Sequence, residues 1–440
     1  MPIREKVVTA HGRRNEDTGR LVLLHSAGGH AESRWREEEL GLRQVLAKYP
    51  DISPFVIIKA DVQRRGVIYT RAALGEVDPE RHMTKVRSDY CEKNDLAPVS
   101  LMLRDGTTVF TEGLMARGHR EPYVVDVASG RTVLTDEGSV IEEVSYWEKP
   151  DYYDKFTARG TPMWQVVSAR PQRLTIHPHQ YCDFWKKKGQ GCKFCVMAEI
   201  RNSTNKPSLL YIEDIIETVA EAVKEPGRNV NIFLTGGSLL GGEALLEEEL
   251  ALYMKILKGV SALFGGRKFP SQLISTAFTK DQLRRLYDQT GLTTYTADIE
   301  VLNEDLFTWI CPGKAAAFGY RGWMERLYHA ADIFGPGNVN TGIVAGVELA
   351  RPKGFSSEDE AIAANIAEAE ELARHGVAVV SCVWRVLKGS VFQRQKSPSL
   401  EYYVRLAKGL DNVRRSHGIP VDMDNYRRCG NHPDTDLGRI

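Results

Sequence analysis

The chain of 440 residues carries 58 Lys and Arg against 58 Asp and Glu, so its formal net charge is zero. This balance argues against a strongly basic surface for nucleic acid and against charge-driven binding to anionic membranes. No run of about 20 apolar residues is present, so we expect no membrane span. The first residues lack the apolar core of a secretory signal, which indicates a cytoplasmic protein.

Residues 1–165 have a mixed pattern that predicts a smaller α+β domain with an accessory or substrate-binding role. Strands are expected at residues 20–26 and 53–60, with a charged helix within residues 31–50 between them. Three further segments have β-rich runs around Asp-Gly or Ser-Gly and predict hairpins. These segments span residues 100–113, 122–134 and 138–147.

Between residues 166 and 400, short β-branched runs alternate with amphipathic helical patterns. Six such runs predict parallel strands joined by right-handed crossovers, and therefore a partial (β/α)6 TIM-like barrel in an α/β fold. Thr279 and Gln282 form a capping-box pattern ahead of one helix, and residues 401–440 are expected as a C-terminal extension. The ligand site of such a barrel lies at the carboxyl ends of its strands. The runs span residues 173–178, 229–237, 272–278, 293–300, 338–346 and 377–384.

Three of the seven cysteines gather directly after the first predicted barrel strand, at Cys182, Cys192 and Cys195. In a reducing compartment such a group indicates metal binding or catalysis rather than disulfides. Three thiolates cannot complete a structural zinc site alone, but they can bind three irons of a 4Fe–4S cluster and leave the fourth iron open. Chance clustering without metal and a zinc site of the Cys3His type are the alternatives. The zinc site would take its fourth ligand from His177, His179 or Asp183.

This loop resembles the cluster motif of the radical S-adenosylmethionine superfamily, C-x3-C-x2-C after the first strand of a partial barrel. Cys192-Lys-Phe-Cys195 matches its second half, with Phe194 at the aromatic position. The first gap is longer, because nine residues separate Cys182 from Cys192. The resemblance implies a 4Fe–4S cluster on the three cysteines and S-adenosylmethionine as a second cofactor, which Phe194 would contact.

Two later motifs extend the resemblance to the expected S-adenosylmethionine site. Gly236 and Gly237 end the second strand and are similar to a family motif whose backbone binds the methionine amino group, with Ser238 in place of its acidic residue. Glu300 ends the fourth strand, where the family has a polar residue near the ribose or methionine. An ordinary turn and a solvated strand end are the simpler interpretations of these residues.

The fifth strand and the helix before it supply the remaining cofactor-binding candidates. Ile343, Val344 and Gly346 resemble a family motif that packs against adenine, although a buried parallel strand has the same pattern. Arg321 offers a fork-shaped guanidinium for the carboxylate of S-adenosylmethionine, and it lies nearer its helix start than Arg326 does. A surface salt bridge is the alternative for either arginine.

The family's chemistry implies that an electron from a flavodoxin or ferredoxin reduces the cluster, that S-adenosylmethionine is cleaved, and that a 5′-deoxyadenosyl radical abstracts hydrogen. Cys311, past the fourth strand, is a candidate for donating a hydrogen atom or holding an intermediate, and Cys429 in the polar tail is a second catalytic candidate. Structural or incidental thiols are the alternative for both. The N-terminal domain lacks a D-x-H-x-x-G cobalamin pattern, which disfavours a cobalamin-dependent methyltransferase.

We therefore expect a radical S-adenosylmethionine enzyme that acts on a small molecule in biosynthesis, by a lyase, rearrangement or bond-forming reaction. A relative that modifies RNA or a peptide is the second hypothesis, and the neutral net charge counts against RNA. A non-catalytic zinc-binding scaffold is the third.

Overall fold

The computed structural model describes six stretches of the chain, residues 39–86, 96–111, 121–170, 172–197, 209–419 and 430–438. Residues Leu40–Ile440 group into one compact unit. The strand expected at residues 20–26 lies outside the described residues. The predicted domain limits at residues 165 and 400 stay predictions.

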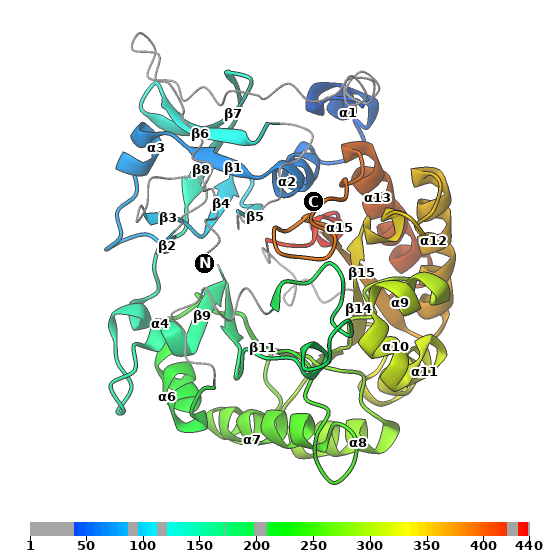
Figure 1. Cartoon of the computed structure of the whole chain (residues 1–440). Coiled ribbons are helices and arrows are strands. Elements are labelled where there is room, and N and C mark those ends of the chain that lie inside the picture. The colour runs from blue at the N-terminus through cyan, green and yellow to red at the C-terminus, as the bar shows by residue number, and fades with distance from the viewer. Residues whose placement is uncertain are drawn as a thin grey trace, which may run out of the picture. The chain divides into compact units, whose positions relative to one another are not determined.

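The N-terminal part of the described chain contains a six-stranded sheet with the order β1-β6-β7-β8-β4-β5 (Figure 1). β1 pairs with β6 in parallel, and the other neighbours are antiparallel. The hairpins expected around the Asp-Gly and Ser-Gly turns are confirmed by the β4–β5 and β6–β7 pairs. A separate antiparallel pair joins β2 (Thr84–Val86) to β3 (Leu96–Pro98). The strands of the larger sheet are β1 (Val67–Tyr69), β4 (Ser100–Leu103), β5 (Thr108–Phe110), β6 (Tyr123–Ala128), β7 (Arg131–Asp136) and β8 (Ser139–Tyr146).

The prediction of a strand at residues 53–60 is wrong, because the structure has helix α2 (Pro54–Arg65) there. Pro54 lies in the first helical turn, where its missing N–H removes no intrahelical hydrogen bond. All residues from 56 to 65 are buried, including five polar or charged ones, so this helix has no exposed polar face. The periodicity of such a short buried run cannot separate a helix from a strand.

The second sheet has seven strands in the order β15-β14-β13-β12-β11-β10-β9 and curls into a partial barrel (Figure 1). β10 to β15 pair in parallel, which confirms the predicted six-unit barrel. β9 (Val167–Arg170) is an addition to the prediction and extends one edge by pairing antiparallel with β10. The parallel strands are β10 (Arg173–Ile176), β11 (Asn231–Thr235), β12 (Ser271–Ile274), β13 (Thr294–Thr296), β14 (Val339–Ala345) and β15 (Val377–Val383).

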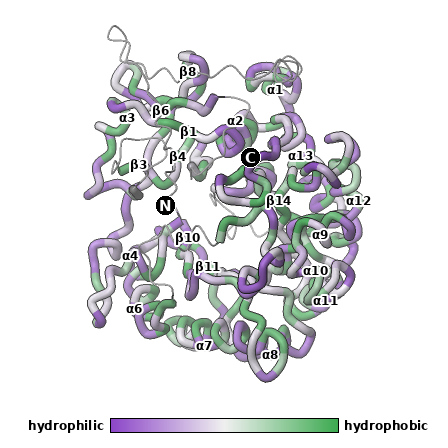
Figure 2. Tube along the Cα trace, viewed as in Figure 1, coloured by the Kyte–Doolittle hydropathy of each residue, from purple (hydrophilic) through white to green (hydrophobic). Residues whose placement is uncertain are grey.

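Helices connect successive barrel strands and lie on the outer side of the sheet (Figure 1). Hydrophobic and hydrophilic residues alternate along α6 and α7 (Figure 2), and the buried ones form the face that packs inward. Thr279 and Gln282 form the predicted capping box at the start of α8. The barrel helices are α6 (Ile212–Ala222), α7 (Glu247–Leu263), α8 (Lys280–Gln289), α9 (Glu304–Ile310), α10 (Pro312–Phe318), α11 (Tyr320–Phe334), α12 (Glu358–Arg374) and α13 (Leu400–Ser416). Shorter helices are α1 (Leu42–Lys48), within the charged segment expected to be helical, α3 (Arg71–Gly75), α4 (Met163–Val166) and α15 (Pro433–Asp436).

One hydrophobic core runs through both sheets, since buried residues of β1, β6, β10 and β12 belong to a single contact cluster. Val67, Val125, Leu174 and Leu273 are fully buried members of this cluster. None of the described helices is long and apolar enough to cross a lipid bilayer. The loops that follow β10, β11 and β13 meet at the carboxyl edge of the barrel sheet and carry the candidate site.

Candidate functional site

The cysteine loop starts beyond the end of β10 and contacts the loop after β11. A short 3-10 helix, Asp183–Trp185, follows Cys182. The Asp183 N–H donates to the Ser238 carbonyl at 2.8 Å, and the Asp183 carboxylate accepts from Leu240 N at 2.8 Å. The first cysteine is therefore held against the end of the second barrel strand.

Two further segments anchor the second half of the cysteine loop. Lys193 N donates to Ile310 O at 2.9 Å, and Gly313 N donates to Gln190 O at 3.0 Å, which joins the loop to α9 and α10. Phe392 N donates to Lys193 O at 3.1 Å, so the segment after β15 also contacts the loop. These main-chain hydrogen bonds fix the backbone at the end of the loop that carries two cysteines.

The three thiols are partly buried and close enough for their charges to interact. Burial raises the pKa of the Cys182 thiol. Burial and the neighbouring Cys192 raise the pKa of Cys195 to about 12. A hydrogen bond with Cys311, together with burial, raises the pKa of Cys192 well above its usual value. The loop alone thus holds neutral thiols, whose protons a bound cluster would displace.

The other cysteines occupy different positions. Cys311 is fully buried at the junction of α9 and α10, beside Cys192. Cys382 is half-buried on β15, and Cys429 lies outside the described residues. Within the described residues, no group of three or more His, Cys, Asp or Glu side chains is arranged to hold a single metal ion.

The glycines after β11 lie against the cysteine loop with no room for a side chain. A Cβ on Gly237 would come within 2.4 Å of Tyr181 O and 2.5 Å of Cys182 Cβ. A Cβ on Gly236 would come within 2.9 Å of His179 Nε2. These separations are shorter than van der Waals contact, so glycine at both positions lets the main chain approach the first cysteine.

Ser238 belongs to a buried polar network at the ends of β11 and β12. Its hydroxyl lies 2.7 Å from the Thr276 hydroxyl, which also lies 2.8 Å from Glu249 Oε2. The Glu249 carboxylate, on α7, accepts from Thr276 N and Leu239 N, each at 2.8 Å. Burial raises the pKa of Glu249 to about 7. An acidic side chain thus reaches this loop from a helix, close to the position where Ser238 replaces the acidic residue of the family motif.

Glu300 has an unusual backbone conformation beyond the end of β13, with φ at 73°. Its N–H donates to Gly342 O and its carbonyl accepts from Val344 N, each at 3.0 Å. Lys314, on α10, donates to the Glu300 carboxylate at 2.8 Å and to the Asp298 carbonyl at 2.6 Å. Strained backbone of this kind occurs at functional sites, where surrounding contacts maintain it.

Two carboxylates and one ammonium therefore meet at the end of β13. Burial acts to lower the pKa of Lys314, but the adjacent Glu300 carboxylate raises it above the ordinary value. Burial and the charge of Glu300 raise the pKa of Asp298 to about 6, while a 2.7 Å hydrogen bond from Gly342 N opposes the shift. Lys314 contacts Asp298 through its main-chain carbonyl and Glu300 through its carboxylate.

The fifth-strand candidates lie on β14 and directly after it. Ile343 is buried, Val344 is half-buried, and Gly346 follows the strand with φ at 107°. Glu348, two residues after Gly346, is buried and accepts from Gly346 N at 2.8 Å and from the Tyr402 hydroxyl. This glutamate therefore fixes the turn after β14 rather than facing the barrel mouth.

Arg321 and Phe194 lie in different surroundings from these residues. The Arg321 side chain is 76% exposed and pairs with Glu304 at 3.1 Å. Arg326, farther along α11, donates to Ala277 O at 2.7 Å, next to the end of β12. Phe194 is half-buried and packs on the main hydrophobic core. The structure thus gathers the candidates from β10 to β14 at the strand ends and places Arg321 at the surface.

The comparisons with known proteins give one curated relative with significant similarity. The chain is 24% identical over 272 residues to bacteriochlorophyllide c C-7(1)-hydroxylase from Chlorobaculum limnaeum. The match covers 59% of this chain and 63% of that protein, so it spans less than two thirds of the relative's length. No family model matches the chain.

Besides this sequence similarity, the chain has a cysteine loop after the first of six parallel half-barrel strands. It also has close-packed glycines at the end of the next strand. These features agree with the resemblance to the radical S-adenosylmethionine superfamily. Distant likeness extends to solved structures. Methylornithine synthase is 16% identical, with TM-score 0.37 over 58% of this chain and 72% of that chain. A radical SAM methyltransferase from Sphaerobacter thermophilus is 15% identical, with TM-score 0.38, and the match covers 90% of this chain and 98% of that chain. The cobalamin-dependent S-adenosylmethionine radical enzyme OxsB is 12% identical, with TM-score 0.34, and the match covers 68% of this chain and 44% of that chain.

The cofactors of the radical S-adenosylmethionine superfamily are a 4Fe–4S cluster and S-adenosylmethionine, and the residues of this site fit both. A cluster with one open iron takes one thiolate for each of its other three irons, and the anchored loop presents three thiols. Gly236 and Gly237 bring the main chain directly against the cysteine loop, because a Cβ at either position would meet His179, Tyr181 or Cys182. A ligand of the cluster would therefore lie near main-chain groups of this strand end.

Several side chains at or near the site were not singled out in the sequence. Glu249 and Lys314 lie on helices with no distinguishing motif, and only the fold brings them to the strand ends. Arg173 is a charged residue at the start of a predicted barrel strand, which the sequence shows, and the structure buries all four residues of that strand. A charge in a fully buried strand is unusual in a parallel sheet and indicates a polar interior.

Proposed function

We propose that the chain is a radical S-adenosylmethionine enzyme that abstracts hydrogen from a small molecule in a biosynthetic reaction. The observation that carries this proposal is the anchored cysteine loop, whose three thiols lie beyond β10 and beside the glycines after β11. The resemblance to the superfamily and the curated relative support the enzyme class. The substrate and the outcome of the reaction are part of the proposal.

When bound, the cluster and S-adenosylmethionine supply a 5′-deoxyadenosyl radical once an electron arrives. We assign the cluster to Cys182, Cys192 and Cys195. In this assignment the strand ends orient S-adenosylmethionine, with main-chain groups near its methionine and apolar side chains near its adenine. The assigned residues are Phe194, Gly236, Gly237, Ser238, Glu300, Ile343, Val344 and Gly346.

Lys314 and Glu249 would act as positioning residues in this site. Lys314 holds the Glu300 carboxylate in one orientation through a 2.8 Å hydrogen bond. Glu249 orders the loop after β11 through Leu239 N. The two residues therefore support groups that would contact S-adenosylmethionine without contacting it themselves.

The assignments of Arg321, Cys311 and Cys429 stay predictions. Arg321 would have to leave its exposed ion pair with Glu304 to reach a cofactor at the strand ends. Cys311 is fully buried against Cys192, which favours support of the cluster loop over donation of a hydrogen atom.

The name of the curated relative supports C–H activation as the shared type of reaction. That protein is named as a hydroxylase of a carbon in bacteriochlorophyllide c, a reaction that replaces a C–H bond. We propose a small-molecule substrate for this chain on the same basis, with modification of RNA or a peptide as the second possibility. A flavodoxin or ferredoxin is the proposed electron donor, and the cytoplasm is the proposed location.

The first prediction tests the cluster assignment. The full chain, purified and reconstituted without oxygen, should bind iron and sulfide and should release 5′-deoxyadenosine from S-adenosylmethionine under reduction. Cys192→Ala should lose both the iron and the product, because the loop then offers two thiolates. Lys187→Ala, an exposed change in the same loop, should retain both. Iron analysis and chromatography of the nucleoside measure the two outcomes.

Two results would contradict this proposal. An iron-free wild-type chain that binds zinc through the same cysteines under oxygen-free conditions would favour a zinc-binding scaffold. A Cys182→Ala variant with full iron content and full 5′-deoxyadenosine release would show that the first cysteine is not a ligand.

A further inference from the structure

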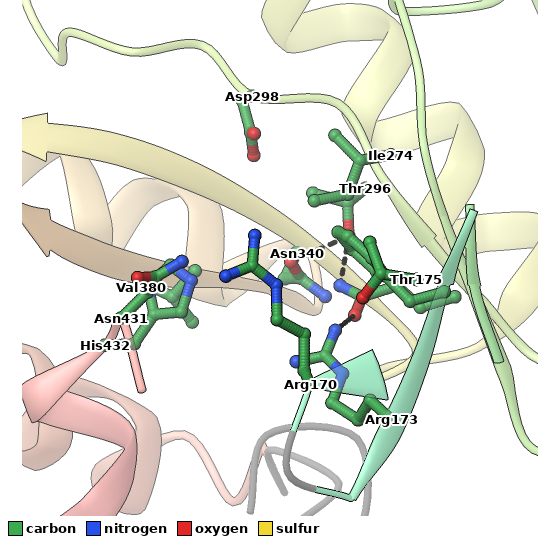
Figure 3. A pocket seen from close by; sticks show the side chains of 12 residues that line it. Arg170, Arg173, Thr175, Ile274, Thr296, Asp298, Asn340, Val380, Asn431 and His432 are labelled. Atoms are coloured by element: carbon green, nitrogen blue, oxygen red, sulfur yellow. Dashed lines mark hydrogen bonds between the residues drawn. The ribbon is translucent and has the colours of Figure 1, made fainter. Parts of the chain in front are cut away.

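A cavity of about 90 Å³ lies inside the barrel, and every strand from β9 to β15 contributes to its wall (Figure 3). Asn431 and His432, from the C-terminal segment, complete the lining. Inward-facing positions of buried parallel strands are ordinarily apolar. Most of this lining is polar or charged, so the interior of the barrel is suited to a polar occupant.

A ladder of hydrogen bonds holds one wall of the cavity in place. Arg173 Nη2 donates to Gln272 Oε1 at 2.9 Å, and Gln272 Nε2 donates to Thr296 Oγ1 at 2.9 Å. Thr296 Oγ1 donates in turn to Asn340 Oδ1 at 2.8 Å. All four side chains are buried, so the ladder fixes their orientation across four neighbouring strands.

Two arginines face the cavity from directly paired positions. Arg170 on β9 is the Cα partner of Arg173 on β10. The Arg170 guanidinium lies 3.9 Å from the centroid of the Phe110 ring, and that of Arg173 lies 4.6 Å from the centroid of the Phe233 ring. These aromatic contacts orient the guanidinium planes. Like charges at paired positions repel each other, and an anion in the cavity would interact favourably with both guanidinium groups.

Thr175 provides an independent indication of a ligand. It lies two residues after Arg173 on the same face of β10, is 1% exposed and lines the cavity. Its hydroxyl has no hydrogen-bond partner within the described residues. Buried hydroxyl groups in native proteins nearly always have a partner. A group bound in the cavity would supply one.

We propose that this cavity is a subsite for an oxyanion of the substrate, a carboxylate or a phosphate group, held by Arg170 and Arg173 and by the Thr175 hydroxyl. Guanidinium groups bind both anions through paired N–H donors, which a lysine ammonium cannot reproduce. The proposal rests on the proposed function, since it identifies the class of substrate that the barrel would accept.

The size of the cavity matches one functional group rather than a whole substrate. Complete ligand pockets usually measure about 300–1,000 Å³, several times this volume. Asp298, across the cavity in Figure 3, lies toward the carboxyl ends of the strands, where its own carbonyl accepts from Lys314. A substrate anchored by its anion would therefore extend the rest of its structure toward the cysteine loop.

The test is anion binding by the anaerobically reconstituted full chain. Sodium acetate and inorganic phosphate are titrated separately at constant ionic strength, and the midpoint temperature of thermal unfolding is measured. Sodium chloride is the control for ionic strength, and acetamide is the neutral analogue of acetate. The wild-type midpoint should rise in a saturable way with acetate, with phosphate or with both, and neither chloride nor acetamide should reproduce the rise. The anion that binds identifies the group as a carboxylate or a phosphate.

The variants separate the subsite from general effects of charge. Arg170→Gln should raise the half-saturating anion concentration at least about tenfold, and Arg170→Lys should give an intermediate value. Thr175→Val should also weaken binding while it leaves the arginines in place. Arg285→Gln, which removes an exposed arginine paired with Glu247, should bind as the wild type does. Arg170→Gln with unchanged affinity, or a wild type without saturable binding, would overturn the subsite.

Failure of the subsite can be distinguished from failure of the proposed function. Release of 5′-deoxyadenosine without saturable anion binding would keep the enzyme assignment and reject the oxyanion subsite. Anion binding that depends on Arg170, in a chain that never releases 5′-deoxyadenosine, would reject the enzyme assignment and with it the role of this cavity in a radical reaction.

Discussion

At the scale of single residues, Glu249 connects the ends of two barrel strands. Its buried carboxylate accepts hydrogen bonds from Leu239 N, beyond β11, and from Thr276 N, beyond β12. Burial raises the pKa of this carboxyl to about 7 from an ordinary value of 4.5. The native state therefore holds the proton of Glu249 more tightly than the unfolded chain does.

This shift gives a prediction for the pH dependence of stability. Because the native pKa is raised, the stabilising contribution is fully present below pH 4.5 and is lost as pH rises through about 7. The wild type should lose at most about 3–4 kcal/mol of unfolding free energy relative to Glu249→Gln across this window, since the pKa rises from 4.5 to about 7 and each pKa unit corresponds to about 1.4 kcal/mol. Urea denaturation of both proteins at several pH values measures the difference. A difference that does not change with pH would contradict the assignment.

At the scale of elements, α10 is a short helix that places one side chain at the barrel mouth. Lys314 lies in its first turn and reaches Glu300 and the Asp298 carbonyl beyond β13. The preceding residue, Gly313, bonds to the cysteine loop through its N–H. The same turn of helix therefore joins the loop to the end of the fourth barrel strand.

Lys314→Met should separate these two connections. The change leaves the partly buried Glu300 carboxylate without its cation, which should cost about 1–3 kcal/mol of stability. The backbone bond of Gly313 remains, so iron content should be unchanged while affinity for S-adenosylmethionine falls. Urea denaturation, iron analysis and equilibrium binding measure these effects. Lys280→Met, at an exposed position on α8, should change stability by less than about 0.5 kcal/mol. Loss of iron in Lys314→Met would contradict this division of roles.

Much of the element pattern could be predicted from the sequence. The six parallel strands were identified because each buried run is followed by a helical pattern with recognisable ends, such as the capping box at Thr279 and Gln282. The sequence of α2 predicts a strand because residues 56–65 are buried on every side of the helix, so no one-sided apolar pattern marks it as helical. β9 is a four-residue strand whose place in the sheet depends on its hairpin with β10, a contact that periodicity does not encode.

The candidate site could be predicted where local motifs specify it. The three cysteines and the glycines after β11 were found because the chemistry requires those residue types next to a strand end. Lys314 and Glu249 reach the same place from helices, and such positions follow from tertiary packing rather than from spacing along the chain. No local motif specifies what an arginine on a helix will bind, and in the structure Arg321 pairs with Glu304 at the surface.

At the scale of the whole molecule, buried ion pairs connect segments from the two ends of the described chain. Lys59 on α2 pairs with Asp436 on α15 at 2.6 Å, and both side chains are at most 2% exposed. Arg414 on α13 pairs with Asp434 at 2.8 Å, and Asp434 also accepts from Ser381 N on β15. The last described helix therefore bridges α2 and the final barrel strand.

Removing one partner of this bridge should destabilise the protein strongly. Lys59→Met removes the buried cation that pairs with the Asp436 carboxylate at 2.6 Å, and we expect a cost of about 3–5 kcal/mol. Lys48→Met, which removes a half-exposed lysine paired with Glu401, should cost less than about 1 kcal/mol. Urea denaturation measures both. Adding Asp436→Leu to Lys59→Met should restore much of the lost stability. Equal losses of stability in Lys59→Met and Lys48→Met would contradict the contribution of the buried pair.

The Phe392–Lys193 hydrogen bond has a consequence for how the protein matures. The cysteines are synthesised well before Ile310, Gly313 and Phe392. A nascent chain therefore exposes its thiols before the segments that anchor the cysteine loop exist. The anchored loop is therefore complete only after residue 392 has been made, and thiols that are not yet anchored are more accessible to oxidants.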